Sequence, residues 1–463
     1  MRTRLLAYQK EYYERTASEA RKEAVQGYVF DTRGSKSVAF HFLENMARHH
    51  IEVYQLAKDY QAAGNKEFQK GSAYVIPVAQ KYSTMVKVLM EDCLEYTDST
   101  FYDISTWTFP HAQLIDNRLI GGESRVGYVF ENREFYAPKV VYELQRKGIR
   151  VSATNRPFQF KNEEGEWTMG YGTYQVLTHN QPLPSDVLYA TLDELAKNTG
   201  VDIYSANTGL MADVDFGSPA FKPLEQPKVA MLVGRGVSIP ESGEIWFLLD
   251  KRFQMRPVLI ENPSLTGKDL KAYNVIILAN GVPNLTKGTE TALKEWVAAG
   301  GVLIATGKAS AWASKQGLIS LKTKETLLEK ADSLSVYRSF ADKAEAKAGK
   351  LIKGVILNCH LDKTHPLAWG LDQDEIAVIK TNDIIFQKDR DPYISPLYYT
   401  KKPLLSGFLS ADNANLLREE PAIMVKPYRS GKVIVFADDM NFRSYFFGTS
   451  KLFMNALFYN KCM

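Results

Sequence analysis

The segment from residue 227 to residue 312 constrains the fold most strongly, because strand and helix patterns alternate along it. Short apolar runs rich in β-forming residues, which are typical of buried strands, alternate with runs of helical spacing. We predict strands at 228–233, 257–260, 273–279 and 301–307, and helices at 244–253 and 289–299. Alternation at this spacing favours right-handed crossovers and a mostly parallel sheet with helices on both faces. An open α/β domain is therefore expected.

Composition limits the possible classes of protein. A chain of 463 residues can form more than one core, and its 24% charged residues are ordinary for a globular protein. The net charge of +4 is spread without a dense Lys/Arg block, so we expect no nucleic-acid partner. No run approaches the ~18 apolar residues of a spanning helix, so no membrane span is predicted. Cys93, Cys359 and Cys462 are too scattered for a zinc ribbon or a disulfide framework.

A short sequence repeat suggests related units in the first half of the chain. Gly27–Phe30 and Gly127–Phe130 are identical, and a helix pattern and a strand pattern follow each of them. We predict repeated βαβ units in which segments 27–91 and 127–204 superpose and could share one composite sheet. A third version begins at Val229. The alternative is that βαβ units resemble one another without duplication.

We divide the chain into an α/β unit at 1–96, a related α/β unit at 97–212 and a larger domain at 213–463. The second unit contains a β-hairpin excursion at 152–172. The Gly- and Pro-rich segment 207–227 is the predicted linker. Further strand candidates predict an inserted β-layer at about 350–430. The strand at 433–437 is expected to return to the central sheet.

The turn after the predicted strand 301–307 is a candidate for chemistry. Class I glutamine amidotransferase-like folds place a nucleophile on such a strand-to-helix elbow. Lys308 and Ala309 occupy this turn, so no thiolate is available there. Ser310 with His360 or His365 is the remaining alternative. We expect an amidotransferase-like fold without its chemistry.

Two other groups of residues suggest sites at first sight. His41 and Glu44 have the spacing of a zinc pair, with His179 downstream, but their amphipathic helix favours a solvated helix face. His360 and His365 precede Pro366 and favour a strand-end turn. We therefore predict no metal or other cofactor in this chain.

The loop after the first central strand is a possible cleft. Gly234, Arg235 and Gly236, with Glu241 in the next helix, lie where Gly-rich loops bind phosphate. The loop lacks both the Gly-x-Gly-x-x-Gly spacing and a Walker lysine. A nucleotide site is therefore not favoured.

Several segments together resemble a known family. They are Tyr102–Pro110, Pro227–Val237, Glu241–Trp246, Gly300–Gly307 and Asn441–Arg443 with Gly448 and Thr449. The chain resembles the region downstream of the catalytic domain in large bacterial zinc carboxypeptidases of the carboxypeptidase A type. The resemblance implies a flavodoxin-like, amidotransferase-like domain with added β-strands, and a catalytic zinc held only in an upstream peptidase domain.

The same resemblance implies the remaining expectations. The upstream peptidase domain is the expected partner, and the full-length family is expected outside the cytoplasm. An exposed aromatic patch of Phe101, Tyr102 and Trp107 is expected where that domain would pack. The resemblance implies a non-catalytic accessory region of a metallocarboxypeptidase. The alternative rests on where open α/β sheets bind ligands: a stand-alone protein that binds or hydrolyses a small ligand or peptide in the amidotransferase-like cleft.

Overall fold

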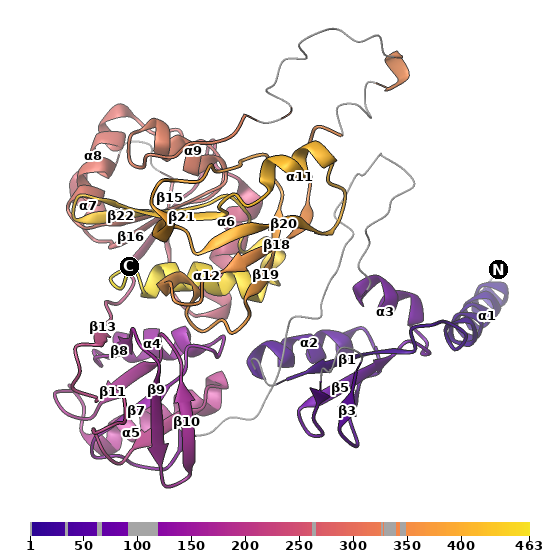
Figure 1. Cartoon of the computed structure of the whole chain (residues 1–463), viewed down its shortest axis with the longest axis horizontal. Coiled ribbons are helices and arrows are strands. Elements are labelled where there is room, and N and C mark those ends of the chain that lie inside the picture. The colour runs from indigo at the N-terminus through magenta and orange to yellow at the C-terminus, as the bar shows by residue number, and fades with distance from the viewer. Residues whose placement is uncertain are drawn as a thin grey trace.

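The computed structural model describes residues 2–32, 36–62, 67–90, 119–261, 265–325, 327, 339–342 and 349–463. Figure 1 shows two smaller α/β units, coloured indigo and magenta, and a larger part that ends in yellow. Cys93, the loop 100–110 with its expected aromatic patch, and His111 lie outside the described residues. None of the described helices combines the length and apolar character that a bilayer crossing needs.

The first unit is a small three-stranded sheet with helices packed against it. Its elements are α1 (Arg2–Ala20), β1 (Gly27–Asp31), α2 (Lys36–Arg48), β2 (Tyr54–Gln55), β3 (Tyr60–Gln61), β4 (Glu67–Phe68), β5 (Ala73–Pro77) and α3 (Ser83–Met90). Strand β5 lies between β1 and β2 and is antiparallel to both. Phe30 of β1 packs edge-on against Phe42 of α2, with ring centroids 5.1 Å apart. The apolar faces of sheet and helix therefore form a shared core.

The second unit contains a six-stranded sheet in the order β13-β8-β11-β7-β12-β6. Its elements are β6 (Leu119–Ile120), β7 (Gly127–Phe130), α4 (Ala137–Arg146), β8 (Ser152–Thr154), β9 (Phe158–Asn162), β10 (Gly165–Met169), β11 (Tyr174–Leu177), α5 (Ser185–Thr199), β12 (Ile203–Ala206) and β13 (Phe221–Pro223). Strands β9 and β10 form the predicted hairpin. The segment 207–227, predicted as a linker, contributes β13 to this sheet through its pairing with β8.

The two units share one topology. Each runs strand, helix, strand, hairpin, strand, helix, and the third sheet strand inserts antiparallel between the first two. The repeated order of elements is therefore present, but the expected parallel pairing is wrong. Because β5 and β11 occupy the middle positions, the strands joined by a helix run in the same direction without touching each other. The composite sheet is also wrong, since the units form separate sheets.

The larger part is built on a sheet in the order β15-β14-β16-β17-β22-β21. Its elements are β14 (Val229–Leu232), α6 (Ile239–Trp246), the π-helical turn η1 (Phe247–Arg252), β15 (Val258–Ile260), α7 (Gly267–Leu270), β16 (Val275–Leu278), α8 (Lys287–Ala298), β17 (Val302–Thr306), α9 (Lys308–Lys315), β21 (Ile423–Tyr428), β22 (Gly431–Phe436) and α12 (Phe447–Phe458). Every pair is parallel except β21 with β22. Strands β14, β16 and β17 are buried throughout, as expected for a sheet covered on both faces. The open α/β fold is confirmed.

An added β-layer follows α9. It consists of β18 (Val355–Leu361), β19 (Glu375–Lys380) and β20 (Leu397–Ser406), accompanied by α11 (Ala411–Leu417) and the 3-10 turns η2 (Phe340–Asp342), η3 (Pro366–Ala368) and η4 (Pro392–Ile394). A further 3-10 turn, η5 (Phe442–Ser444), follows β22 and contacts α6. The predicted layer at about 350–430 is therefore too long. Strand β21 belongs instead to the central sheet as its antiparallel edge, because it pairs with β22 through a tight turn. The predicted return of the chain at 433–437 is confirmed as β22.

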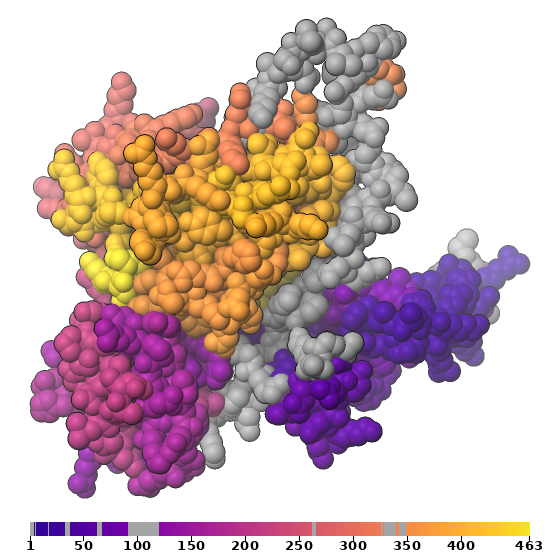
Figure 2. Space-filling model, in the orientation of Figure 1, coloured from indigo at the N-terminus to yellow at the C-terminus, as the bar shows by residue number. Residues whose placement is uncertain are grey.

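Helix α12 joins the second unit to the larger part. Tyr459 donates a hydrogen bond from its hydroxyl to the Gly172 carbonyl at 2.8 Å, and the Asn132 side chain donates to the Trp369 carbonyl at 2.8 Å. Lys451, also on α12, donates to the Asn132 carbonyl. Figure 2 shows the magenta unit in contact with the orange β-layer. These bonds fix the second unit against the domain that carries the candidate site.

Candidate functional site at the carboxyl edge of the central sheet

The carboxyl ends of β14, β16, β17 and β22 lie along one edge of the sheet, where open α/β sheets bind ligands. Asn280 follows β16 and connects two neighbouring elements at this edge. Its side-chain nitrogen donates to Glu241 Oε1 of α6 at 2.6 Å, and its Oδ1 accepts from the Lys308 backbone nitrogen at 2.9 Å. One amide thus holds α6 against the turn after β17.

The turn between β17 and α9 is a sharp strand-to-helix elbow, and a glycine occupies the position at which the chain turns. Gly307 precedes α9 with φ 50° and ψ −125°, a conformation that side chains rarely adopt. A Cβ atom there would lie 2.5 Å from Asn280 Oδ1. The expected position of the elbow at Lys308 and Ala309 is therefore wrong, because both residues already belong to α9. Asn280 occupies the space that a nucleophile at this elbow would need.

Ser310, the alternative nucleophile, is buried behind the elbow. Its hydroxyl lies 3.0 Å from the Ala305 carbonyl and 3.3 Å from the Phe436 carbonyl. His360 is an exposed residue with Nδ1 3.2 Å from Glu375 Oε1, and His365 Nδ1 accepts from the Leu367 nitrogen at 3.1 Å. Ser310 therefore bonds to the main chain, and the two histidines are engaged elsewhere.

Three carboxyl side chains, those of Glu241, Glu244 and Asp439, form a cluster beside the elbow. Burial raises the pKa of Glu241 to about 7, and the charge of nearby Asp439 contributes. Burial also raises the pKa of Glu244 and of Asp439, and the hydrogen bond with Glu244 raises the pKa of Asp439 further. Backbone nitrogens hold both groups: Arg443 donates to Glu244 Oε1 at 2.8 Å and Asn441 to Asp439 Oδ1 at 3.0 Å. Burial therefore favours the protonated form of both carboxyls over a higher pH range than is usual for a carboxyl.

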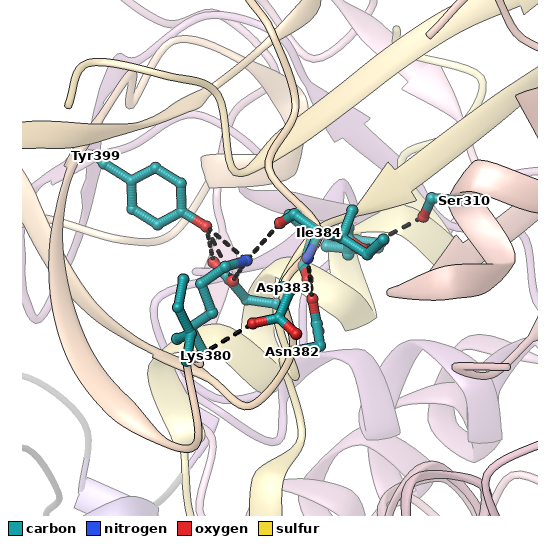
Figure 3. Close-up of polar contacts among 10 residues, drawn as sticks. Ser310, Lys380, Asn382, Asp383, Ile384 and Tyr399 are labelled. Carbon is teal, nitrogen blue, oxygen red and sulfur yellow. Dashed lines mark hydrogen bonds and ion pairs between the residues drawn. The ribbon is translucent and has the colours of Figure 1, made fainter. Parts of the chain in front are cut away.

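The residue before Asp439 has a structural role. Asp438 Oδ1 lies 3.0 Å from Lys380 Nζ, and both side chains are fully buried. The Tyr399 hydroxyl donates to Asp438 Oδ2 at 2.7 Å, and Lys380 also donates to the Ile384 carbonyl at 2.6 Å. Figure 3 shows Lys380 and Tyr399 converging on this point, with Ser310 apart from them. The added β-layer thereby anchors the loop after β22 and positions Asp439.

The Gly-rich loop after β14 does not form the expected cleft. Val237 bridges to Gly281 of the next loop, and a Cβ atom on Gly236 would lie 2.1 Å from the Val282 carbonyl oxygen. The cavity lined by Arg235 has a volume of only about 100 Å³. Of the predicted cleft residues Gly234, Arg235, Gly236 and Glu241, Glu241 belongs to the cluster of carboxyl side chains.

Comparison with solved structures finds matches that cover about half of the chain. PurLQS from Thermotoga maritima matches with a TM-score of 0.33 and 13% identity, over 50% of this chain and 97% of that chain. A ThuA-like protein from Parabacteroides merdae matches with a TM-score of 0.33 and 14% identity, over 50% and 90% of the two chains. A GMP synthase subunit from Thermoplasma acidophilum has a TM-score of 0.32 and 8% identity, over 50% and 94%.

Other comparisons found no match. No family model matches the sequence, and no curated protein matches it significantly. The function is therefore argued from the residues of this chain.

His41 and Glu44 lie at a junction between units. His41 Nε2 is 2.7 Å from the Tyr136 hydroxyl of the second unit, and its ring stacks on Phe447 of α12 with centroids 5.9 Å apart. The expected solvated helix face is therefore wrong for His41, because the larger part covers it. Glu44 lies 3.6 Å from His41 Nδ1 and also pairs with Arg48. Within the residues that the structure describes, no group of His, Cys, Asp or Glu has a metal-binding arrangement.

A pocket of about 1100 Å³ lies where the first unit faces α6, η1 and η5. Glu244 and Arg443 line it and also belong to the carboxyl edge. The pocket therefore meets the cluster of carboxyl side chains at Glu244. Sequence reasoning missed this junction, and it also missed Asn280, Gly307 and Asp439. The available signal was the position of polar residues and glycine directly after successive buried strands.

Proposed function

We propose that this chain is a non-catalytic accessory region of a zinc metallocarboxypeptidase-like protein, with an amidotransferase-like domain that has no nucleophile. The observation that carries the proposal is the elbow: Gly307 has no side chain, and Asn280 fills the adjacent space. The buried hydroxyl of Ser310, which contacts two carbonyls, also supports it. In this proposal the zinc and the peptidase chemistry belong to the upstream domain, which is the partner.

A glutaminase assay tests the missing nucleophile. We expect no release of ammonia from L-glutamine above the background without protein, because acyl transfer needs an activated nucleophile at the elbow. The Ser310→Ala variant serves as the control for the alternative nucleophile. Saturable ammonia release that is abolished in Ser310→Ala would contradict the proposal.

Metal analysis and a peptidase assay test the missing zinc chemistry. A catalytic zinc needs about three protein ligands and an open position for water. We expect substoichiometric zinc in chelator-free protein, equal in the wild type and in His41→Ala, and no release of C-terminal residues from a peptide. Stoichiometric zinc that is lost in His41→Ala, together with peptide cleavage, would show that this chain contains the catalytic centre.

A binding experiment tests the partner. A carboxypeptidase A-type domain from the same genome, mixed with this chain at micromolar concentration, should co-elute with it in size-exclusion chromatography. Separate elution would contradict the accessory role and would not affect the fold assignment.

The second candidate function is the binding of a small ligand at the carboxyl edge. The observation that favours it is the large pocket, which is lined by Glu244 of the carboxyl cluster at this edge. Pockets of this size with a few polar groups are typical of small-molecule sites. This function does not depend on a peptidase partner.

A further inference from the structure

The pocket between the first unit and the larger part has an extensive apolar wall. Side chains of α1, α2 and α3 form much of it, among them Tyr12, Met46, Met85 and Leu89, together with Tyr82 just before α3. Its volume of about 1100 Å³ is large enough for a small organic molecule. An apolar wall of this kind favours a ligand with an aliphatic or aromatic body.

The charged groups of the same pocket are mostly positive. Lys81, Arg252 and Arg443 line it, against the carboxyl group of Glu244. Lys81 already lies over the rings of Tyr13 and Tyr82, at 4.9 Å and 5.3 Å from their centroids. The charge balance therefore favours an anionic group on the ligand.

Arg252 is the side chain best placed to receive that group. Its guanidinium lies 5.5 Å from the ring centroid of Phe247 and 4.8 Å from that of Phe447. One NH2 nitrogen donates to the Ser444 carbonyl at 2.8 Å, while Nε is a buried donor without a partner. Among the described residues, no carboxylate forms an ion pair with Arg252. The guanidinium is thus held in place at the pocket wall without an ion-pair partner among the described residues, and such a group is suited to binding a carboxylate.

The backbone around Arg252 is unusual in two places. Arg252 ends the π-helical turn η1, a form that is rare and frequent at functional sites. Arg443 and Ser444, which also line the pocket, adopt positive φ angles of 46° and 57°. Consecutive left-handed residues other than glycine carry strain, and such strain clusters at ligand-binding sites.

We propose that this pocket binds a small organic carboxylate with an apolar body, whose carboxylate pairs with the guanidinium of Arg252. The apolar body lies against the wall formed by the first unit. This inference rests on the second proposed function, ligand binding at the carboxyl edge, and is independent of the accessory role.

Calorimetric titration of the full chain tests the ligand class. The probes are N-acetyl-L-phenylalanine and octanoate, each compared with its primary amide, which has the same body without the charge. We expect at least one carboxylate to bind, and its amide to bind at least tenfold more weakly, because a charge-assisted hydrogen bond is lost. Equal binding of acid and amide would overturn the carboxylate class but leave ligand binding intact. No binding of either acid would overturn the inference.

Two variants test the place of binding. Arg252→Gln should weaken carboxylate binding at least tenfold and leave binding of the amide unchanged. Lys251→Gln is the matched control, because it removes the same charge from the neighbouring residue, which stacks on Trp246 at 5.1 Å. Equal binding by Arg252→Gln and the wild type would overturn the proposed pairing.

A further substitution, Gly243→Leu, should fill the pocket without changing its charge. Gly243 lines the pocket within α6, and no atom lies within 4 Å of the position of a Cβ atom there. Gly243→Leu should therefore fold and abolish binding, whereas Gly288→Leu in α8 should bind normally. Wild-type affinity in Gly243→Leu would show that the ligand binds elsewhere.

Discussion

The Oδ1 atom of Asn280 leaves no room for a side chain on Gly307, since a Cβ atom there would lie only 2.5 Å from it. The same Oδ1 accepts from the Lys308 nitrogen at 2.9 Å, and the amide nitrogen donates to Glu241 at 2.6 Å. The elbow is thus closed by a side chain that also holds the neighbouring helix. A residue with a side chain at 307 would disturb both contacts.

Gly307→Ala should destabilise the protein. The alanine would need an unfavourable φ and would collide with Asn280, so we expect a loss of about 2 kcal/mol or more in the free energy of unfolding. Urea unfolding of the purified variant measures this loss. Gly267→Ala, which has no atom within 4 Å of the new Cβ, should change stability little. Similar stability of both variants would argue against a closed elbow.

Glu241 should make stability depend on pH. Its pKa is raised to about 7 in the folded protein, against an ordinary value near 4.5. The folded state therefore binds the proton more tightly, so this contribution is fully present below about pH 4.5 and is lost as pH rises through about 7. Full loss corresponds to about 3 kcal/mol.

Glu241→Gln tests this dependence because glutamine keeps the shape and remains neutral. Unfolding free energies measured at several values of pH should fall less steeply with rising pH in Glu241→Gln than in the wild type. Glu295→Gln, at an exposed position of α8, should leave the slope as in the wild type. An unchanged slope in Glu241→Gln would contradict the raised pKa.

The ion pair of Lys380 and Asp438 should be sensitive to loss of one partner. Lys380→Met leaves a fully buried carboxylate without its cation, which should cost about 3 kcal/mol or more. The double variant Lys380→Met/Asp438→Leu should regain much of this stability because no buried charge remains. Urea unfolding of the single and double variants measures both effects. Lys401→Met, at an exposed position of β20, is the control, and an equal loss there would refute the explanation.

Protonation of His41 at acidic pH should weaken the contact of the first unit with the larger part. Burial, together with the charge of Arg252, lowers the pKa of His41 below its ordinary value of 6.5. The folded state therefore disfavours the protonated form, and stability is lost as pH falls below about 6.5.

Hydrogen exchange of the α2 amides can follow this change. We expect faster exchange at pH 5 than at pH 7, after correction for the intrinsic rate, and a smaller difference in His41→Gln. His179→Gln changes a histidine far from this junction in the sequence and should behave like the wild type. Equal pH dependence in all three proteins would exclude His41 as the cause.

The repeat shows what a local sequence pattern can predict and what it cannot. Identical residues at Gly27–Phe30 and Gly127–Phe130 predict related units, and the order of elements after them is the same. The pairing could not be predicted, because the inserted strands β5 and β11 lie more than forty residues after the strands β1 and β7 that they contact. Contacts that are distant in sequence leave no local periodicity.

The sequence by itself determined the open α/β fold, since buried strands and amphipathic helices have distinct periods in each short segment. It also showed that the turn after β17 has no cysteine. Only the tertiary structure decided that Gly307 is the elbow residue, that Asn280 closes it, and that Glu244 and Asp439 are buried with raised pKa values. These relations join residues from different loops, and parallel pairing of the strands brings those loops to one edge. Distances and burial at that edge set the pKa values, and neither quantity is encoded in a local pattern.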